Sequence, residues 1–302
     1  MKRRCARTIP SMPNRSRNRS RRCASWGNWH PRPAPLEEDF TDYKPIGQGG
    51  MGIVYRAIQK SLDRPVALKF LLHVGDIDER HRTRFLREAT ATAALEHANI
   101  VPVYGIDISG PRPFYAMKFI DGHSLAEVLH ELRRRAEPDH EPRTSPAVSL
   151  TRLVDRIIAD DCTAIGGKLD PSMSSTVKAT APLRLGPAYM NAVARLALQA
   201  AKALRHTHIN DVYHRDVKPG NLLLDLGGHL WLADFGLADL KGRDGTRSTE
   251  RVGGTALYRS PEQSSPEMPP IDQRTDIFSL GATIYELITL KDPPQITKTD
   301  QA

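Results

Sequence analysis

One stretch of this chain, residues 214–221 (HRDVKPGN), limits its possible folds more than any other, and Asp-Phe-Gly follows it at 234–236. Two carboxylates, Asp216 and Asp234, and the amide of Asn221 stand on polar turns beside short apolar runs. Runs of this length are typical of strands. They cover residues 212–213, 222–224 and 230–232. We therefore expect the three oxygen-bearing side chains to project from loops on a sheet.

This set of side chains suits phosphoryl transfer. The reaction needs one carboxylate to accept the proton of an attacking hydroxyl, and oxygen ligands for the Mg²⁺ that neutralises nucleotide phosphates. The two motifs together resemble part of the protein-kinase signature. The alternative is a chance turn on a surface loop. It would suffice for three letters, but it does not account for two motifs in this order with apolar runs between them.

Residues 43–57 carry Gly-x-Gly-x-x-Gly at Gly47, Gly49 and Gly52. A dinucleotide-binding version of this pattern leads from a strand into a helix. Here Gly52 leads instead into residues 53–55, a β-branched and aromatic run that favours a strand. The pattern predicts two strands joined by a glycine turn, a flap whose backbone N–H groups approach phosphate oxygens closely.

Lys69 lies inside an apolar run at residues 66–71, which predicts a strand. A buried lysine needs a partner. The charged stretch at about 78–96 predicts a helix, and its Glu88 is the natural partner, which leaves Lys69 directed at nucleotide phosphates. The alternative is that Glu88 is one more exposed acid on a charged helix. The glycine flap just upstream favours the ion pair.

Further strands are expected within 97–104 and 114–120, which completes a small antiparallel sheet with one helix. With Ser-Pro-Glu at 260–262, five motifs then follow one another along the chain. Residues 40 to about 290 resemble a eukaryotic-like serine/threonine protein kinase of the kind also common in bacteria. The resemblance implies an α+β, two-lobed protein kinase-like fold. Its small lobe is the sheet with one helix, and its larger lobe is mainly helical and incomplete at the C-terminus.

The resemblance also implies the reaction, transfer of the γ-phosphoryl of Mg-ATP to Ser or Thr hydroxyls of protein substrates, with autophosphorylation. Asp216 would accept the hydroxyl proton, Lys218 would contact the γ-phosphate, and Thr255 would support the catalytic Asp. The expected catalytic residues are Asp216, Lys218, Lys69, Glu88 and Thr255. The expected Mg²⁺ ligands are Asn221 and Asp234. The residues expected to contact ATP are Ile46, Gly47, Gln48, Gly49, Gly50, Met51, Gly52, Ile53, Val54, Lys69, Met117, Lys118 and Ile120.

Arg215 precedes the catalytic Asp, and by the same resemblance it would pair with a phosphate on the segment between Asp234 and Glu262. That segment offers Thr246, Ser248 and Thr249 as acceptors. A phosphate there would bring almost two negative charges and could order the segment through arginine contacts. We hypothesise that one of the three is autophosphorylated.

The domain organisation expected is a basic disordered tail at 1–38, a small lobe at 39–120 and a partial large lobe at 121–302. Residues 1–32 hold ten Lys or Arg and no acid, whereas the whole chain carries +8, so the basic charge belongs to the tail. A tail of this composition can bury too little apolar surface to offset the conformational entropy that it would lose on becoming ordered. It could touch nucleic acid, but a solvated tail is the more common case, so no nucleic-acid partner is expected.

An insertion is expected at about 133–187, where the family has a short loop between two helices. Inside it, Leu150, Leu153, Val154, Ile157 and Ile158 form a stripe that predicts one amphipathic helix. Two interpretations stay open, a helix that docks a partner and a helix packed back on the lobe. Either way its apolar face needs a cover.

The resemblance breaks near the end of the chain. The long buried helix expected to open at Asp276 is not followed by the last three helices of the family, and Glu262 lacks its usual arginine partner. An apolar patch is therefore expected on the exposed side of this helix. Its expected members are Ile277, Leu280, Ile284 and Leu287, with the inserted stripe as one candidate cover. A catalytically incomplete ATP-binding or scaffold kinase fragment is the alternative function.

Composition adds the remaining expectations. No apolar run approaches the roughly 18 residues of a membrane-spanning helix, and no apolar region follows the basic start as in a signal peptide, so a cytoplasmic protein is expected. The three cysteines share no CxxC spacing, which argues against a disulfide framework or a zinc site. The sequence leaves the protein substrate and the oligomeric state open.

Overall fold

A five-stranded antiparallel sheet forms the first part of the fold, with strand order β1-β2-β3-β5-β4. The computed structural model describes residues 39–49, 52–71, 79–108, 113–136, 148–159, 185–235, 255–264 and 271–294. The strands are β1 (Phe40–Gly49), β2 (Gly52–Gln59), β3 (Arg64–Leu71), β4 (Val103–Asp107) and β5 (Phe114–Lys118). One helix, α1 (Glu79–Ala93), accompanies this sheet. The small sheet with one helix is thus confirmed.

The central strand β3 explains why the sheet forms where it does. From Val66 onward every residue of β3 is buried, Lys69 included. At the start of β2 the chain passes so close to β3 that a Cβ on Gly52 would overlap the carbonyl oxygen of Phe70. Gly52 is therefore required for the two strands to pair in this register, which sets Val54 opposite Lys69.

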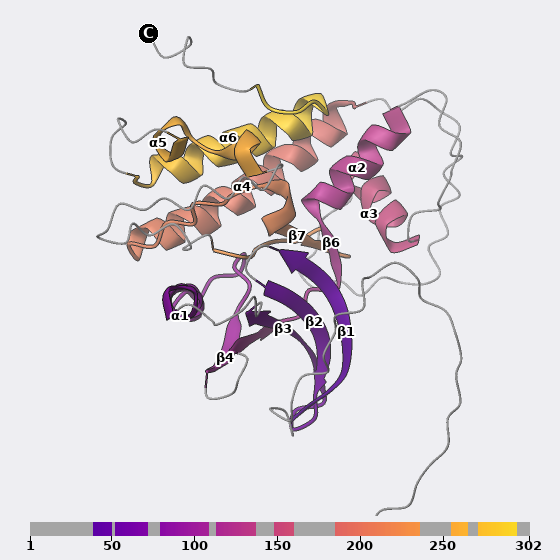
Figure 1. Cartoon of the computed structure of the whole chain (residues 1–302). Helices are drawn as coiled ribbons and strands as arrows, with labels where there is room; N and C mark the ends of the chain where they lie inside the picture. The colour runs from indigo at the N-terminus through magenta and orange to yellow at the C-terminus, as the bar shows by residue number, and fades with distance from the viewer. Residues whose placement is uncertain are drawn as a thin grey trace, which may run out of the picture. The chain divides into compact units, whose positions relative to one another are not determined.

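The second part of the fold is mainly helical (Figure 1). Its long helices are α2 (Leu125–Ala136), α3 (Val148–Ala159), α4 (Pro187–Ile209) and α6 (Arg274–Thr289). Its short elements are β6 (Gly122–Ser124), η1 (Pro219–Asn221), β7 (Leu222–Asp225), β8 (Leu230–Leu232), η3 (Thr255–Tyr258) and α5 (Pro261–Ser264). The strands β6, β7 and β8 form an antiparallel sheet. Of the three apolar runs expected as strands around the 214–221 loop, only residues 212–213 are not a strand.

Local sequence signals account for the helix α2. Ser124 caps it, because its hydroxyl accepts from the backbone N–H of Glu127 while that glutamate accepts from the N–H of Ser124. This reciprocal arrangement is a capping box. The apolar residues Leu125, Val128, Leu129 and Leu132 have helical spacing, and all four are buried in the core.

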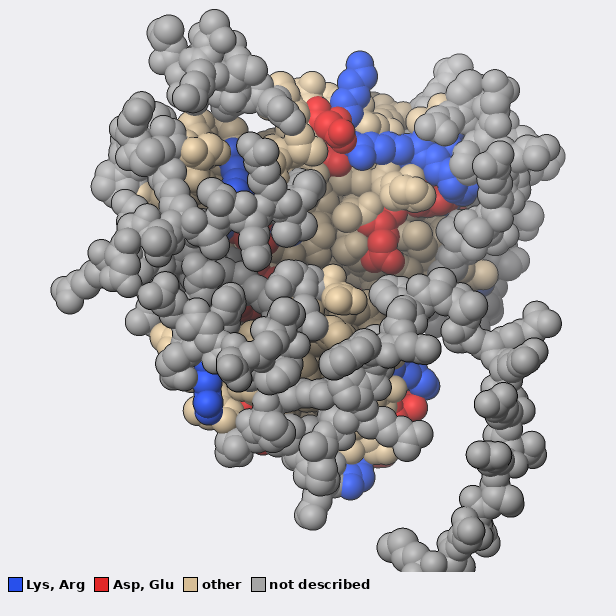
Figure 2. Space-filling model, in the orientation of Figure 1, with Lys and Arg blue, Asp and Glu red and all other residues tan. Residues whose placement is uncertain are grey.

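Helix α3 resolves the open question about the inserted stripe, because it packs back on the lobe, against α2, α4 and β6. Leu153, Val154 and Ile157 are buried in the same core as α2 and α4. Arg135 of α2 donates to Asp155 at 2.7 Å and to the carbonyl oxygen of Thr151. In Figure 2 acidic and basic side chains adjoin in the upper part of the molecule, where Figure 1 shows α2 and the end of α6.

Helices α4 and α6 run side by side in opposite directions. The hydroxyl of Tyr189 near the start of α4 donates to the carbonyl oxygen of Leu287 near the end of α6. The expectation of an exposed apolar patch on α6 was partly wrong, because Leu280 and Leu287 are buried and Ile284 packs against the core. The apolar side chains of α6 that are exposed are Ile277, Tyr285 and Ile288.

Glu262 of α5 was expected to lack the arginine partner usual in the family, and in the structure it accepts a hydrogen bond of 2.6 Å from the Thr275 hydroxyl at the start of α6. Among the described residues, no helix combines the length and apolar character that crossing a membrane would require.

The packing of α3 leads to a stability prediction. Ile157→Ala is expected to lower the free energy of unfolding by about 3 kcal/mol, because it removes a fully buried side chain and leaves a cavity. The matched change Val148→Ala, on the exposed side of the same helix, is expected to cost less than about 0.5 kcal/mol. Chemical denaturation of the two variants measures the difference. Equal, small losses would contradict the packing of α3 into the core.

Candidate active site

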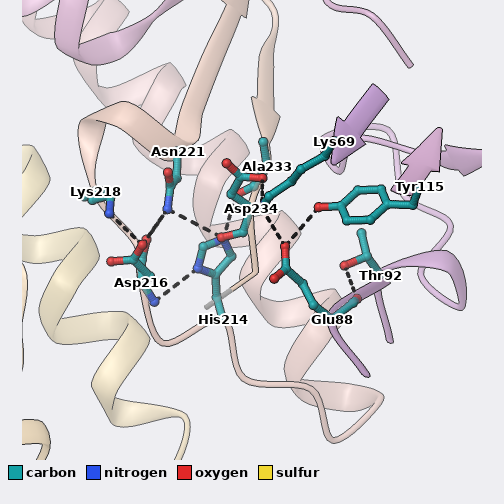
Figure 3. A network of polar contacts seen from close by, with 10 residues as sticks. All are labelled: Lys69, Glu88, Thr92, Tyr115, His214, Asp216, Lys218, Asn221, Ala233 and Asp234. Carbon is teal, nitrogen blue, oxygen red and sulfur yellow. Dashed lines mark hydrogen bonds and ion pairs between the residues drawn. The ribbon is translucent and has the colours of Figure 1, made fainter. Parts of the chain in front are cut away.

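Side chains from five separate segments meet at one place between the two parts of the fold (Figure 3). Lys69 comes from β3, Glu88 from α1, and Tyr115 from β5. Residues 214–221, which follow α4, and 233–234, which follow β8, supply the rest. The sequence analysis had paired Lys69 with Glu88 and had grouped the last two segments, and the fold adds Tyr115.

Lys69 lies between two carboxylates. Its Nζ is 2.8 Å from Oε1 of Glu88 and 2.9 Å from Oδ1 of Asp234. The ion pair expected between Lys69 and Glu88 is therefore present, with both side chains buried. Burial alone would lower the pKa of Lys69, but the negative charge of Asp234, together with Glu88, holds it well above its ordinary value. Lys69 thus carries a positive charge at neutral pH.

Asp234 presents its carboxylate toward the same point. Its partial burial would raise its pKa, but the charge of Lys69 and the hydrogen bond from it lower the pKa below the ordinary value. The carboxylate is 39% exposed, so one side of it faces solvent. Its backbone has φ of 53°, a left-handed conformation that is uncommon for a residue with a side chain. An ionised, partly accessible oxygen donor in a constrained backbone suits cation binding.

Asp216 is held by two donors. Lys218 Nζ lies 2.6 Å from its Oδ2, and Asn221 Nδ2 donates to the same oxygen at 3.0 Å and to the backbone carbonyl of Asp216 at 2.8 Å. Among the described side chains no donor to Oδ1 of Asp216 is found, and the carboxylate is 26% exposed. One oxygen is thus fixed, and the other can accept a proton from a substrate.

His214 ties the loop to the strand β8. Its ring is fully buried, its Nε2 lies 2.9 Å from the carbonyl oxygen of Ala233, and its Nδ1 accepts from the N–H of Asp216. These partners assign the proton to Nε2. The ring also packs against Phe235, with centroids 4.6 Å apart. His214 therefore holds the two acidic motifs at a fixed separation.

Asp276 supports the loop at residues 214–221 through hydrogen bonds, a role that the sequence analysis did not predict. Its carboxylate accepts from the backbone N–H groups of His214 and Arg215 at 2.9 and 2.7 Å, and it lies 2.8 Å from His208 Nε2. Arg215 has φ of 64°, so these bonds stabilise a backbone conformation that would otherwise be costly. The sequence did contain a signal for this role. Asp276 is an acid at the start of an apolar helix, and a buried acid needs hydrogen-bonding partners.

The residues expected to contact ATP lie around the Lys69 end of the site. Residues 46–49 end β1 and residues 52–54 begin β2, with Gly49 opposite Gly52, as the strand–turn–strand prediction required. Gly50 and Met51 lie outside the described residues. Met117 and Lys118 end β5, and Ile120 follows it. The backbone N–H of Lys118 donates to Pro102, so this N–H is engaged within the protein.

Other expected residues lie wholly or partly outside the described residues. Thr255 begins η3, but its side chain lies outside the described part. The acceptors Thr246, Ser248 and Thr249 and the tail at 1–38 also lie outside it.

Asn221 and Asp234 fit the chemistry of a Mg²⁺ site. Asn221 uses its nitrogen toward Asp216, and Figure 3 shows its oxygen turned the other way. Asp234 uses Oδ1 toward Lys69, which leaves Oδ2. Two hard oxygen donors, with waters and phosphate oxygens completing the shell, are the usual protein share of a Mg²⁺ site. No cluster of three or more His, Cys, Asp or Glu suited to a metal occurs among the described residues.

Comparison with known proteins gives a consistent result. A family model for protein tyrosine and serine/threonine kinases matches residues 40–302. A probable serine/threonine-protein kinase of Clostridium acetobutylicum is 30% identical over 248 residues, which cover 82% of this chain and 29% of that protein. A probable serine/threonine-protein kinase of Streptomyces coelicolor is 31% identical over 254 residues, 82% of this chain and 30% of that protein. The serine/threonine-protein kinase PknL of Mycobacterium tuberculosis is 33% identical over 264 residues, 86% of this chain and 52% of that protein. The chain spans about half the length of these relatives or less.

The support from Asp276 leads to a pH prediction. Burial alone would raise the pKa of Asp276, but the hydrogen bond from His208 and the two backbone N–H donors lower it below its ordinary value of 3.8. The stability that this carboxylate contributes is therefore fully present above pH 3.8 and is lost as the pH falls through its lower folded pKa. Asp276→Asn is expected to cost about 3 kcal/mol at pH 7, because an amide presents an N–H group to donors.

Denaturation from pH 7 to pH 2 measures this effect. The gap between parent and Asp276→Asn should narrow below pH 3.8, whereas Asp292→Asn, at an exposed ion pair, should follow the parent throughout. A gap that stays constant with pH would contradict the role of the Asp276 charge.

Proposed function

This chain belongs to the protein tyrosine and serine/threonine kinase family, and we propose that it transfers the γ-phosphoryl of Mg-ATP to Ser or Thr hydroxyls of proteins. The observation that carries the proposal is the joint placement of Lys69, Asp234, Asn221 and Asp216. A charged lysine, two oxygen donors for a cation and a partly free carboxylate follow one another across the site. This is the equipment of phosphoryl transfer, which depends on positioning and charge neutralisation.

Each residue has a separate task in this proposal. Lys69 binds phosphate oxygens, and Glu88 orients it. Asp216 directs the substrate hydroxyl and accepts its proton at Oδ1, while Lys218 lies beside it to contact the transferred phosphoryl. Asn221 and Asp234 hold Mg²⁺, which neutralises charge that develops on the phosphates.

The choice of Ser or Thr as acceptor has its own support. Lys218 follows Asp216 by two residues, the arrangement that the sequence resemblance associates with serine/threonine kinases. The relatives in Clostridium, Streptomyces and Mycobacterium carry names of serine/threonine kinases.

Phosphorylation of the chain itself is part of the proposal. Nε of Arg215 is buried and has no hydrogen-bond partner among the described residues. A phosphate on Thr246, Ser248 or Thr249 would supply a charged partner.

The domain division is likewise proposed, with a basic tail at 1–38, a small lobe at 39–120 and a large lobe at 121–302 interrupted by an insertion at about 133–187.

Autophosphorylation is the direct test. The purified chain, incubated with labelled ATP and Mg²⁺, is expected to incorporate label, with mass spectrometry placing it on Thr246, Ser248 or Thr249. Asp216→Asn is expected to lose at least about 100-fold in rate, because the amide cannot accept the proton. Asp292→Asn is the matched control and should retain the rate. Absence of label in the parent, with ATP still bound, would instead favour a catalytically incomplete nucleotide-binding protein.

The metal role has a separate test. Asn221→Ala is expected to require at least about tenfold more Mg²⁺ for half-maximal rate, because one of two protein ligands is lost. Titration of the initial rate with Mg²⁺ at saturating ATP measures this. An unchanged Mg²⁺ requirement would remove Asn221 from the metal site, even if the maximal rate fell through the lost bonds to Asp216.

A further inference from the structure

Tyr115 lies inside the network of Figure 3, yet the proposed reaction gives it no task. It is 3% exposed, in the middle of β5, directly opposite Lys69 in the pairing of β3 with β5. Its hydroxyl donates to Oε1 of Glu88 at 2.9 Å, the same oxygen that Lys69 contacts at 2.8 Å. Its ring packs against Phe85 of α1, with centroids 5.1 Å apart. Tyr115 thus contacts both the carboxylate and the helix that carries it.

The charges in this cluster explain why a second donor is needed. Glu88 and Asp234 share one cation, Lys69, so the three groups together carry a negative charge. A buried carboxylate is costly unless other hydrogen bonds satisfy it. Tyr115 supplies such a bond without adding positive charge. Burial raises the pKa of Tyr115 well above its ordinary value, so the hydroxyl keeps its proton.

The two donors to Glu88 would respond differently to a nucleotide. The ammonium group of Lys69 is attracted by phosphates, whereas the neutral hydroxyl of Tyr115 is not. We propose that Tyr115 is a positioning residue that keeps the Glu88 carboxylate and α1 in place while Lys69 engages the phosphates. This inference rests on the proposed phosphoryl transfer, and it adds a residue that the sequence reasoning had missed. The signal was a tyrosine in an apolar strand, and only the strand register places it beside Lys69.

A double-mutant cycle tests the inference. Tyr115→Phe keeps the ring and is expected to lower kcat/KM for ATP about tenfold, the effect of losing one hydrogen bond to a charged group. If the hydroxyl acts through the Glu88 charge, the same change made in Glu88→Gln should cost less than about twofold. A hydroxyl that merely stabilises the fold would give the same factor in both backgrounds. That additive result would overturn the inference, as would full activity of Tyr115→Phe.

A second measurement needs neither nucleotide nor turnover. Amide hydrogen exchange along α1 is expected to be about tenfold faster in Tyr115→Phe than in the parent, with α4 unchanged. Tyr104→Phe is the matched control, because Tyr104 lies on β4 of the same sheet with an exposed side chain. Unchanged exchange in α1 would overturn the role of Tyr115. If the parent shows no phosphoryl transfer, the proposed function fails, and the exchange experiment still decides whether Tyr115 holds α1.

Discussion

The site depends on one buried cation, Lys69, placed between two carboxylates from different parts of the chain. Glu88 comes from α1 and Asp234 from the segment after β8, so the lysine joins the sheet, its helix and the second part of the fold. In the protein interior, any of these three charges left without a partner of opposite sign would cost more free energy than in water. The same charges that hold the segments together are those that would meet phosphates and Mg²⁺. Stability and chemistry therefore constrain the same three residues.

A second buried charge, Asp276, fixes the loop that carries Asp216. It accepts from two successive backbone N–H groups and lies beside His208, so the start of α6, the end of α4 and the loop form one unit. Because Arg215 takes a left-handed backbone, the loop needs external support to keep its shape. The carboxylate of Asp216 then projects from a rigid base. The position of the Asp216 loop thus depends on a residue some 60 positions later in the chain.

The sequence predicted what depends on local pattern. The strands and the inserted amphipathic helix follow from period and residue type, and Lys69 could be paired with Glu88 because a buried lysine in a strand needs an acid. Contacts that depend on strand register or on helix packing were not available from the sequence. Tyr115 lies beside Glu88 only because β5 pairs with β3 in one register. The buried state of Leu280 was missed because the other side of α6 was assumed to be uncovered.

The same limit applies to the three arginines at the end of α2, residues 133–135, which lie where the insertion was expected to begin. In the fold they satisfy two buried acids. Arg134 and Arg135 donate to Glu131, and Arg133 donates to Glu286, which also accepts from the hydroxyl of Tyr258 in η3. Removing any one partner would leave a buried charge short of donors.

This arrangement has a consequence for the insertion. Arg135 also fixes α3, and Arg133 also donates to the carbonyl oxygen of Leu290 after α6. The chain between α2 and α4 can therefore be long without disturbing the site. Its described helix, α3, is bound to the last turn of α2, and the same turn of α2 is bound to α6. Helix α6 in turn carries Asp276 and so holds the loop at residues 214–221. Ion pairs and hydrogen bonds of α2 and α6 thus connect the inserted helix α3 with the loop of the proposed active site.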